Sequence, residues 1–136
     1  MIRILILILF LGISKVYGET SFFQDGKVFF ENKDFEKAKF KFEQDIVFNP
    51  KSEKSYLYLS KIFNKEKKID LAKINLETVL LINPKNEEAV FDLMKIQIKK
   101  SNFSEVKKNL SNFKRICKNL CFRKIEIEQD LKNFKN

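Results

Sequence analysis

The chain has no histidine and no tryptophan, and its 136 residues include only three glycines, two prolines and two cysteines. Without histidine, the protein lacks the usual proton-transfer group at neutral pH and the commonest ligand of transition metals. Only Gly26 remains after the first eighteen residues, which excludes a glycine-rich phosphate-binding loop. Two cysteines without histidine cannot complete a four-ligand zinc site in one chain. We therefore expect a protein that is not an enzyme and holds no metal and no cofactor.

The scarcity of glycine and proline also bears on the fold. Few turns can form, and long stretches rich in Leu, Lys, Glu and Ile favour helices. Apolar residues make up 44% of the chain, and 15 phenylalanines supply bulky groups for a packed core. The composition predicts an all-α fold.

The first eighteen residues, MIRILILILFLGISKVYG, differ from the rest. Arg3 precedes an apolar run over residues 4–13, and Val16 and Gly18 stand at the small-residue positions of a cleavage site before Glu19. This pattern is typical of a secretory signal peptide, and the run is short for a bilayer span. Two alternatives stay open, cleavage after Gly18 or an uncleaved N-terminal anchor. Either way we expect export to the periplasm, to the cell envelope or to the outside.

The formal net charge of the whole chain is +9. Cleavage would remove Arg3 and Lys15 and no acid, which lowers the net charge to +7. A basic protein can bind nucleic acid, anionic lipid or acidic protein segments. Because export separates the chain from nucleic acid, we expect no nucleic-acid partner.

Both prolines stand in nearly the same phrase. NPKSE covers residues 49–53 and NPKNE covers residues 83–87, with Pro50 and Pro84 34 positions apart. Proline marks helix boundaries, so the repeated phrase indicates a repeated structural unit. Dividing the chain into units 19–52, 53–86 and 87–120 aligns small residues at positions 8 and 20 between larger ones. Position 8 of the three units holds Gly26, Ser60 and Met94, and position 20 holds Ala38, Ala72 and Val106.

Two short helices that cross closely need small side chains at the crossing, because the interaxial distance depends on them. With its 34-residue period, its small positions and its boundary prolines, the chain resembles the tetratricopeptide repeat family. KDFEKA (33–38) and SNFSEV (101–106) are similar to the start of that family's second helix. The resemblance implies a right-handed α-solenoid of three helix–turn–helix repeats, with residues 121–136 as a capping helix.

The helices expected from this register, with Ser21 and Asp34 as the first N-caps, are Phe22–Asn32, Phe35–Phe48, Glu53–Asn64, Asp70–Leu81, Glu87–Lys99, Ser104–Cys117 and Phe122–Phe134. The third repeat departs from the pattern, since Lys118 stands where the boundary proline is expected. Its second helix is therefore expected to run on or to end irregularly. Cys117 and Cys121 flank this point, and they form either a disulfide across a bend or two buried thiols.

In the resembling family, the first helix of each repeat lines a concave groove that binds a protein partner. Carried over by position, the groove has a column of three apolar residues, Phe23, Leu57 and Phe91, beside a column of three lysines, Lys27, Lys61 and Lys95. The neighbouring groove positions supply Phe30, Tyr58 and Asp92. These nine residues predict a partner segment with apolar and acidic side chains. The other interpretation of the lysine column is coincidence in a lysine-rich chain.

Two hypotheses of function follow. The first is a non-enzymatic protein-binding module, an adaptor, scaffold or assembly factor in the cell envelope. The second is a structural protein at a membrane surface, held by an uncleaved N-terminus and by basic contacts to anionic lipid.

The native N-terminus distinguishes the two hypotheses. We expect mass spectrometry of the protein from its own cells to find a chain that begins at Glu19, because the cleavage pattern ends at Gly18. A chain that retains residues 1–18 would instead support the membrane-surface hypothesis.

Overall fold

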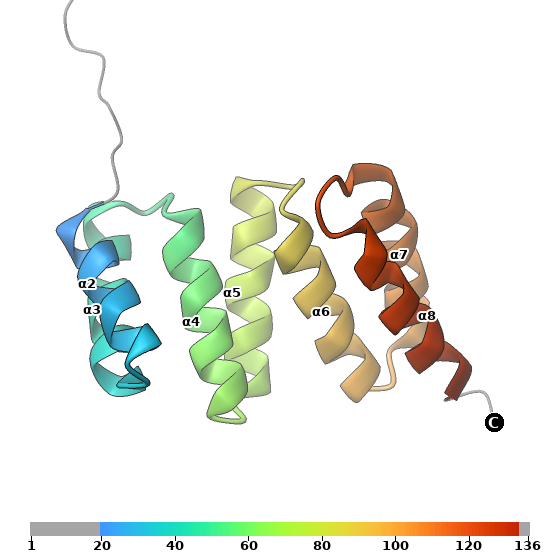
Figure 1. Cartoon of the computed structure of the whole chain (residues 1–136), viewed down its shortest axis with the longest axis horizontal. Coiled ribbons are helices and arrows are strands. Elements are labelled where there is room, and N and C mark those ends of the chain that lie inside the picture. Colours follow the sequence, from blue (N-terminus) through green and yellow to red (C-terminus); the bar gives the residue numbers. More distant parts are fainter. Residues whose placement is uncertain (1–19, 134–136) are drawn as a thin grey trace, which may run out of the picture.

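The computed structural model describes residues 20–133, and the expectations for residues 1–18 and for Phe134 lie outside this part of the chain. The described residues form helices and no strand, so the all-α prediction is confirmed (Figure 1). The α-helices are α2 (Ser21–Glu31), α3 (Phe35–Phe48), α4 (Glu53–Lys65), α5 (Ile69–Ile82), α6 (Glu87–Lys99), α7 (Phe103–Ile116) and α8 (Lys124–Asn133). A single 3₁₀ turn, η1 (Cys121–Arg123), precedes α8. Within residues 20–133, no helix is long and apolar enough to cross a membrane.

The helices form a row of pairs. Helix α2 packs on α3, α4 on α5 and α6 on α7, while α3 with α4 and α5 with α6 join one pair to the next. Figure 1 shows α2, α4, α6 and α8 in one layer and α3, α5 and α7 in the layer behind them. Helix α8 contacts both α6 and α7 and covers the end of the row. This is an α-solenoid, as the repeat pattern predicts.

The close crossing within each pair depends on the small residues. Ala38, Ala72 and Val106 of the second helices are fully buried. Across from Ala38 lies Gly26, where an added Cβ would lie 2.8 Å from a ring carbon of Phe42, closer than atoms normally approach. The hydrogen atom of glycine is therefore what lets α2 approach the Phe42 ring.

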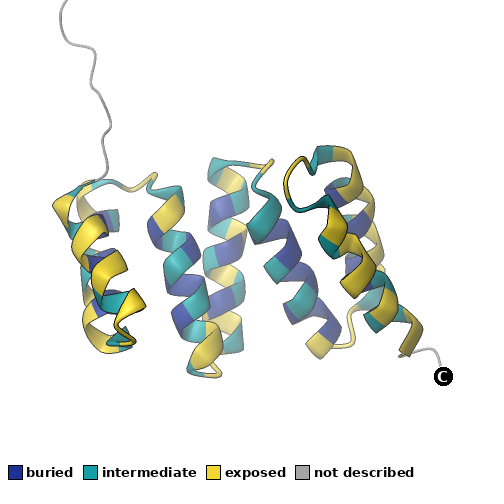
Figure 2. Cartoon of the chain, viewed as in Figure 1, coloured by how far each residue is buried: buried dark blue, intermediate teal, exposed yellow. Residues whose placement is uncertain are grey.

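The core is continuous along the row, because apolar side chains from each pair meet those of the next. Phe42 is buried with Ile62, Leu76 with Leu93, and Phe113 with Met94. Phe63 and Leu80 each pack against two of these three clusters and connect them. Figure 2 shows the buried residues concentrated where the two layers face each other. One helix pair alone would leave much of this surface in water, which is why the repeats stabilise one another.

Each first helix ends in the same turn. Lys33, Lys67 and Ser101 have left-handed backbone with φ of 63°, 60° and 56°. They occupy the same position of the three units. In each turn, the N–H of the left-handed residue donates to the carbonyl three residues earlier, and the next N–H donates to the carbonyl five residues earlier, as at Asp34 and Phe29 (2.9 Å). This Schellman motif satisfies the last carbonyls of the helix. Its presence in all three pairs shows that the third unit keeps the register.

A buried carboxylate joins the first two repeats. Asp45 of α3 is buried and accepts hydrogen bonds from the hydroxyls of Thr20 and Ser55. Thr20 is also the N-cap of α2, accepting from the N–H of Phe23 at 3.1 Å. The prediction of Ser21 as this cap is wrong, because the helix begins one residue earlier and Ser21 lies within its first turn. Asp34 caps α3 as predicted, accepting from the N–H of Lys37.

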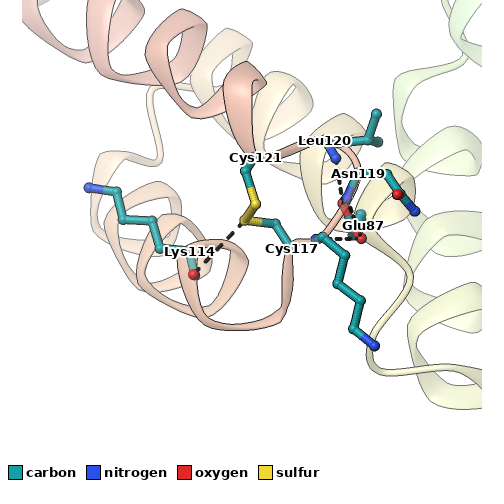
Figure 3. The surroundings of a disulfide bond; sticks show 7 residues. Glu87, Lys114, Cys117, Asn119, Leu120 and Cys121 are labelled. Atoms are coloured by element: carbon teal, nitrogen blue, oxygen red, sulfur yellow. Dashed lines mark hydrogen bonds between the residues drawn. A yellow bond between two sulfur atoms is a disulfide. The ribbon is translucent and has the colours of Figure 1, made fainter.

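The third repeat ends irregularly, as the missing proline suggested. Helix α7 stops at Ile116, and residues 117–120 fold back before η1. Cys117 and Cys121 are joined by a disulfide, with their Cα atoms 5.2 Å apart (Figure 3). The capping helix consequently begins at Lys124 and not at Phe122.

Glu87 holds the same bend in place. Its carboxylate accepts from the backbone N–H groups of Lys118 (2.8 Å), Asn119 (3.1 Å) and Leu120 (2.7 Å), as Figure 3 shows. A proline at position 118 would remove one of these donors. Partial burial raises the pKa of Glu87, but the three N–H groups and the Lys118 charge outweigh it and lower the pKa below its usual value. The carboxylate is thus the form that the bend stabilises.

The repeated left-handed turns generate a stability prediction. We expect Lys67→Gly to raise the free energy of unfolding by about 0.5–1 kcal/mol, because glycine adopts positive φ without the steric cost that lysine bears there. Lys65→Gly, two residues earlier and still within α4, should lower it, since glycine weakens a helix. Urea unfolding followed by circular dichroism measures both. A loss of stability at Lys67→Gly would contradict the assigned turn.

Candidate binding groove

Two hollows lie next to each other along the face of α2, α4 and α6. The first has a volume of about 340 Å³ and the second of about 380 Å³, and Lys61 lines both. We call them together the groove. All nine residues predicted from the sequence line it. Phe23, Lys27, Leu57 and Tyr58 line the first hollow, and Phe30, Phe91, Asp92 and Lys95 line the second, with Lys61 between them.

Tyr58 of α4 is the centre of the aromatic floor between the hollows. Its ring centroid lies 5.0 Å from that of Phe30, 5.8 Å from that of Phe23 and 4.9 Å from that of Phe42. The contacts to Phe30 and Phe23 are edge-to-face, and the contact to Phe42 is stacked, which are favourable arrangements of aromatic rings. The rings fix one another, so this floor is preformed.

The expected open apolar column is not what the structure shows. Phe23, Leu57 and Phe91 are only 4%, 8% and 1% exposed. These side chains belong to the core clusters. They form the bottom of the groove and offer a partner little surface. Phe30 and Tyr58, which are half-buried, are the aromatic residues that a partner could contact more widely.

Cations lie over the aromatic floor. The Nζ atom of Lys61 is 5.0 Å from the Tyr58 ring centroid, and the Arg123 guanidinium carbon is 3.5 Å from that of Phe91. Such contacts are attractive, more so where water is excluded. Arg123 comes from η1, so the C-terminal segment contributes to the end of the groove. Sequence reasoning missed Arg123, because its position in the unit pattern lies after the last repeat.

The three lysines of the predicted column all have carboxylate partners. Lys27 Nζ lies 3.8 Å from Glu31, and Lys61 Nζ lies 2.7 Å from Glu88. Lys95 Nζ lies 2.9 Å from Glu126 and 2.7 Å from Asp130, both on α8. Burial lowers the pKa of Lys95, but its hydrogen bonds to Asp130 and Glu126 outweigh it and raise the pKa. The spacing of Glu126 and Asp130, four residues apart, places both acids on one side of a helix, but it does not indicate Lys95 as their partner.

Asp92 is the acid inside the groove. Burial and the nearby charge of Glu88 raise its pKa to about 6, although Lys61 and Arg123 oppose the shift. The negative charge of the Asp92 carboxylate is only partly balanced by the positive charges of Lys61 and Arg123. The site is therefore sensitive to pH and to any charged group that enters it.

The charge of the groove is positive on balance. Its lining includes seven cations, Lys27, Lys54, Lys61, Lys65, Lys95, Lys99 and Arg123, against four acids, Glu53, Glu88, Asp92 and Glu126. The described residues contain no cluster of acids and cysteines suited to a metal. The arrangement of a half-buried aromatic floor and a cationic surround suits binding of a segment with apolar and acidic groups.

Comparison with known proteins supports the fold. No family model matches the chain, and no curated protein matches it. A solved structure described as the CopN-Scc3 complex contains a chain that is similar over 82% of this one, with a TM-score of 0.66 and 15% identity. This chain spans 65% of the length of that one. The similarity shows a helical-repeat fold seen in a protein–protein complex.

The position of Asp92 generates a pH prediction. Its folded pKa of about 6 lies above the ordinary value of 3.8 for aspartate, so its ionisation opposes folding. The stabilising effect of the neutral form is fully present below pH 3.8 and is lost as the pH rises through about 6. We expect Asp92→Asn to raise the free energy of unfolding at pH 7.5 by about 1–2 kcal/mol and to change it little at pH 4.

Urea unfolding at both pH values measures this difference. Asp25→Asn is the matched control, because Asp25 is exposed and paired with Lys41 at 3.1 Å, and its effect should be small at both pH values. Equal effects of Asp92→Asn at the two pH values would contradict the raised pKa.

Proposed function

We propose that this chain is a non-enzymatic adaptor or assembly factor that binds a segment of another protein in the groove. The observation that carries the proposal is the preformed aromatic floor of Phe30 and Tyr58 beneath a surplus of lysines. A hollow of a few hundred Å³, mostly apolar at its base and with a few charged groups, is typical of a binding site. The structural neighbour, itself part of a protein–protein complex, supports a protein as the partner class.

The partner segment that fits best carries apolar and acidic side chains. Its carboxylates would compete with Glu88 for Lys61 and with Glu126 for Lys95, which are pairs between partly exposed groups. Such pairs are individually weak, so exchanging them costs little. Movement of Lys61 toward a partner carboxylate would uncover the Tyr58 ring beneath it. Acidic and apolar groups in one segment would then bind together.

We further propose that the chain is a divergent tetratricopeptide repeat protein of the cell envelope. The 34-residue period and the three equivalent left-handed turns support the repeat assignment. The disulfide between Cys117 and Cys121 supports an oxidising compartment such as the periplasm, since cytosolic thiols are kept reduced. Anchoring at a membrane surface remains the alternative if residues 1–18 are retained.

Peptide probes test the proposed chemistry. We expect a labelled peptide that alternates Leu or Phe with Glu to bind by fluorescence anisotropy, and the same peptide with Lys in place of Glu to bind at least about tenfold more weakly. Lys61→Gln combined with Lys95→Gln should weaken binding of the Glu peptide, mainly through slower association at low ionic strength.

The matched control is Lys107→Gln combined with Lys108→Gln, which changes the net charge equally on exposed residues of α7 outside the groove lining. It should leave binding nearly unchanged. If both double variants weaken binding to the same extent, overall charge and not the groove would explain the affinity.

A further inference from the structure

The solvent-facing side of α3 and α5 carries large apolar side chains that the core does not use. Phe40 and Val47 of α3 are 57% and 74% exposed, and Ile74 and Leu81 of α5 are 56% and 83% exposed. None of the four belongs to the core clusters. The two residues of each helix are seven positions apart, which places them on one side two turns from each other.

The exposed residues occur at equivalent places of the two repeats. Phe40 and Ile74 hold position 22 of their units, and Val47 and Leu81 hold position 29. Acids precede them on the same helix side, at positions 18 and 25. We call these eight residues the outer stripe: Glu36, Phe40, Glu43, Val47, Asp70, Ile74, Glu77 and Leu81.

The third repeat lacks this pattern. The same four positions of α7 hold Ser104, Lys108, Ser111 and Arg115. Helix α7 therefore presents a polar, basic surface where α3 and α5 present apolar and acidic groups. This contrast provides a control within the same fold.

The lysines next to the stripe on α3 are directed to neighbouring helices. Lys41 reaches Asp25 of α2 at 3.1 Å, and Lys39 reaches toward Glu66 after α4 at 3.8 Å, with both lysine side chains largely covered. Lys39 also contacts Glu36, whose side chain is 79% exposed.

On α5, Glu77 pairs with Lys73 at 3.1 Å, and Asp70 pairs with Lys100. In these pairs, as in that of Glu36, the carboxylate side chain is more exposed than its lysine. An approaching protein meets an apolar and acidic surface.

Two other occupants fit this surface poorly. The stripe's carboxylates would oppose anionic lipid headgroups. A two-fold dimer through the stripe would place the acids of one copy against those of the other, because such an interface uses the same surface twice. A basic helix has neither problem.

We propose that the outer stripe docks a basic amphipathic helix of a partner protein, with apolar residues on one side and Lys or Arg beside them. The apolar side would cover Phe40, Val47, Ile74 and Leu81, and the basic residues would pair with the acids between them. Amphipathic helices commonly bind an apolar surface of another protein through side chains that recur every three or four residues. Large exposed apolar patches rimmed by polar residues mark interaction surfaces.

This surface lies on the second helices, whereas the groove lies on the first. Figure 1 shows the two sets of helices in different layers. One partner can therefore occupy the groove while a second occupies the outer stripe, and the two would be recognised by opposite chemistry. The groove takes an acidic segment and the stripe takes a basic one.

A synthetic probe tests the stripe. The probe is an 18-residue peptide designed as a helix with Leu on one side and Lys on both flanks, and its counterpart has Glu in place of Lys. We expect the Lys peptide to bind the stripe of the whole chain. The Glu peptide is a ligand for the groove under the function proposed above, so its binding should not depend on the apolar residues of the stripe. Phe40→Ser combined with Ile74→Ser should reduce binding of the Lys peptide about tenfold or more.

Charge variants make the test specific. Glu43→Lys combined with Glu77→Lys should also weaken the Lys peptide about tenfold and should strengthen the Glu peptide. Ser111→Lys places a lysine at the position of the third repeat that is equivalent to Glu43 and Glu77. It should leave the affinities of the Lys peptide and of the Glu peptide unchanged. All variants are exposed or surface changes, and unfolding curves check that each remains folded.

The outcomes separate the alternatives. The stripe as a specific site would be overturned if Phe40→Ser with Ile74→Ser weakened both peptides equally. It would also be overturned if Ser111→Lys weakened the Lys peptide as much as Glu43→Lys with Glu77→Lys does. Sedimentation that shows a dimer lost with Phe40→Ser and Ile74→Ser would make a second copy the occupant and overturn the proposal. Binding to phosphatidylglycerol vesicles that depends on Phe40 and Ile74 would also overturn the proposal and would make lipid the occupant.

Discussion

The close crossing of the two helices in each pair is the constraint on which the rest of this structure depends. The helices approach closely because position 20 is Ala38, Ala72 or Val106, and because Gly26 leaves space for the Phe42 ring. At this separation, large residues such as Phe42 and Phe113 can fill the space on either side of the crossing without voids. Each pair then has an apolar side that only the next pair can cover, so the chain must stack. Stacking fixes which helix sides line the groove and which face outward.

The sequence predicted the buried part of the structure well, for a physical reason. Buried positions must be small at the crossing and large beside it, and prolines must stand outside helices, so the pattern reveals the register. The predicted helices Phe35–Phe48 and Glu87–Lys99 have the observed bounds, and the others differ by one or two residues. The left-handed turns at Lys33, Lys67 and Ser101 were not predictable, because none of them is the glycine or asparagine that marks such a turn. Tertiary packing imposes that backbone there.

The groove shows the opposite case. All nine predicted residues line it, because the position of a side chain on a helix follows from the register. Whether these side chains are exposed to a partner does not follow from the register. Phe23, Leu57 and Phe91 are buried, and the partners of Lys61 and Lys95 come from other helices, α6 and α8. A pairing such as that of Lys95 with Asp130 depends on how the last helix packs, which no pattern within a single repeat encodes.

The end of the array shows how one repeat can change its boundary without losing the fold. Units one and two have a proline at position 32, near their ends, whereas unit three has Lys118 at that position. Glu87 makes use of the N–H that proline would lack, and it gathers two further N–H groups of the same bend. The disulfide joins Cys117 and Cys121 across that bend, so the carboxylate and the covalent link hold the same segment. The bend in turn places Arg123 over Phe91 and brings Glu126 and Asp130 to Lys95. The charge and cover of the groove's last hollow thus depend on a boundary outside it, and a change at Glu87 or the cysteines would reach the groove through α8.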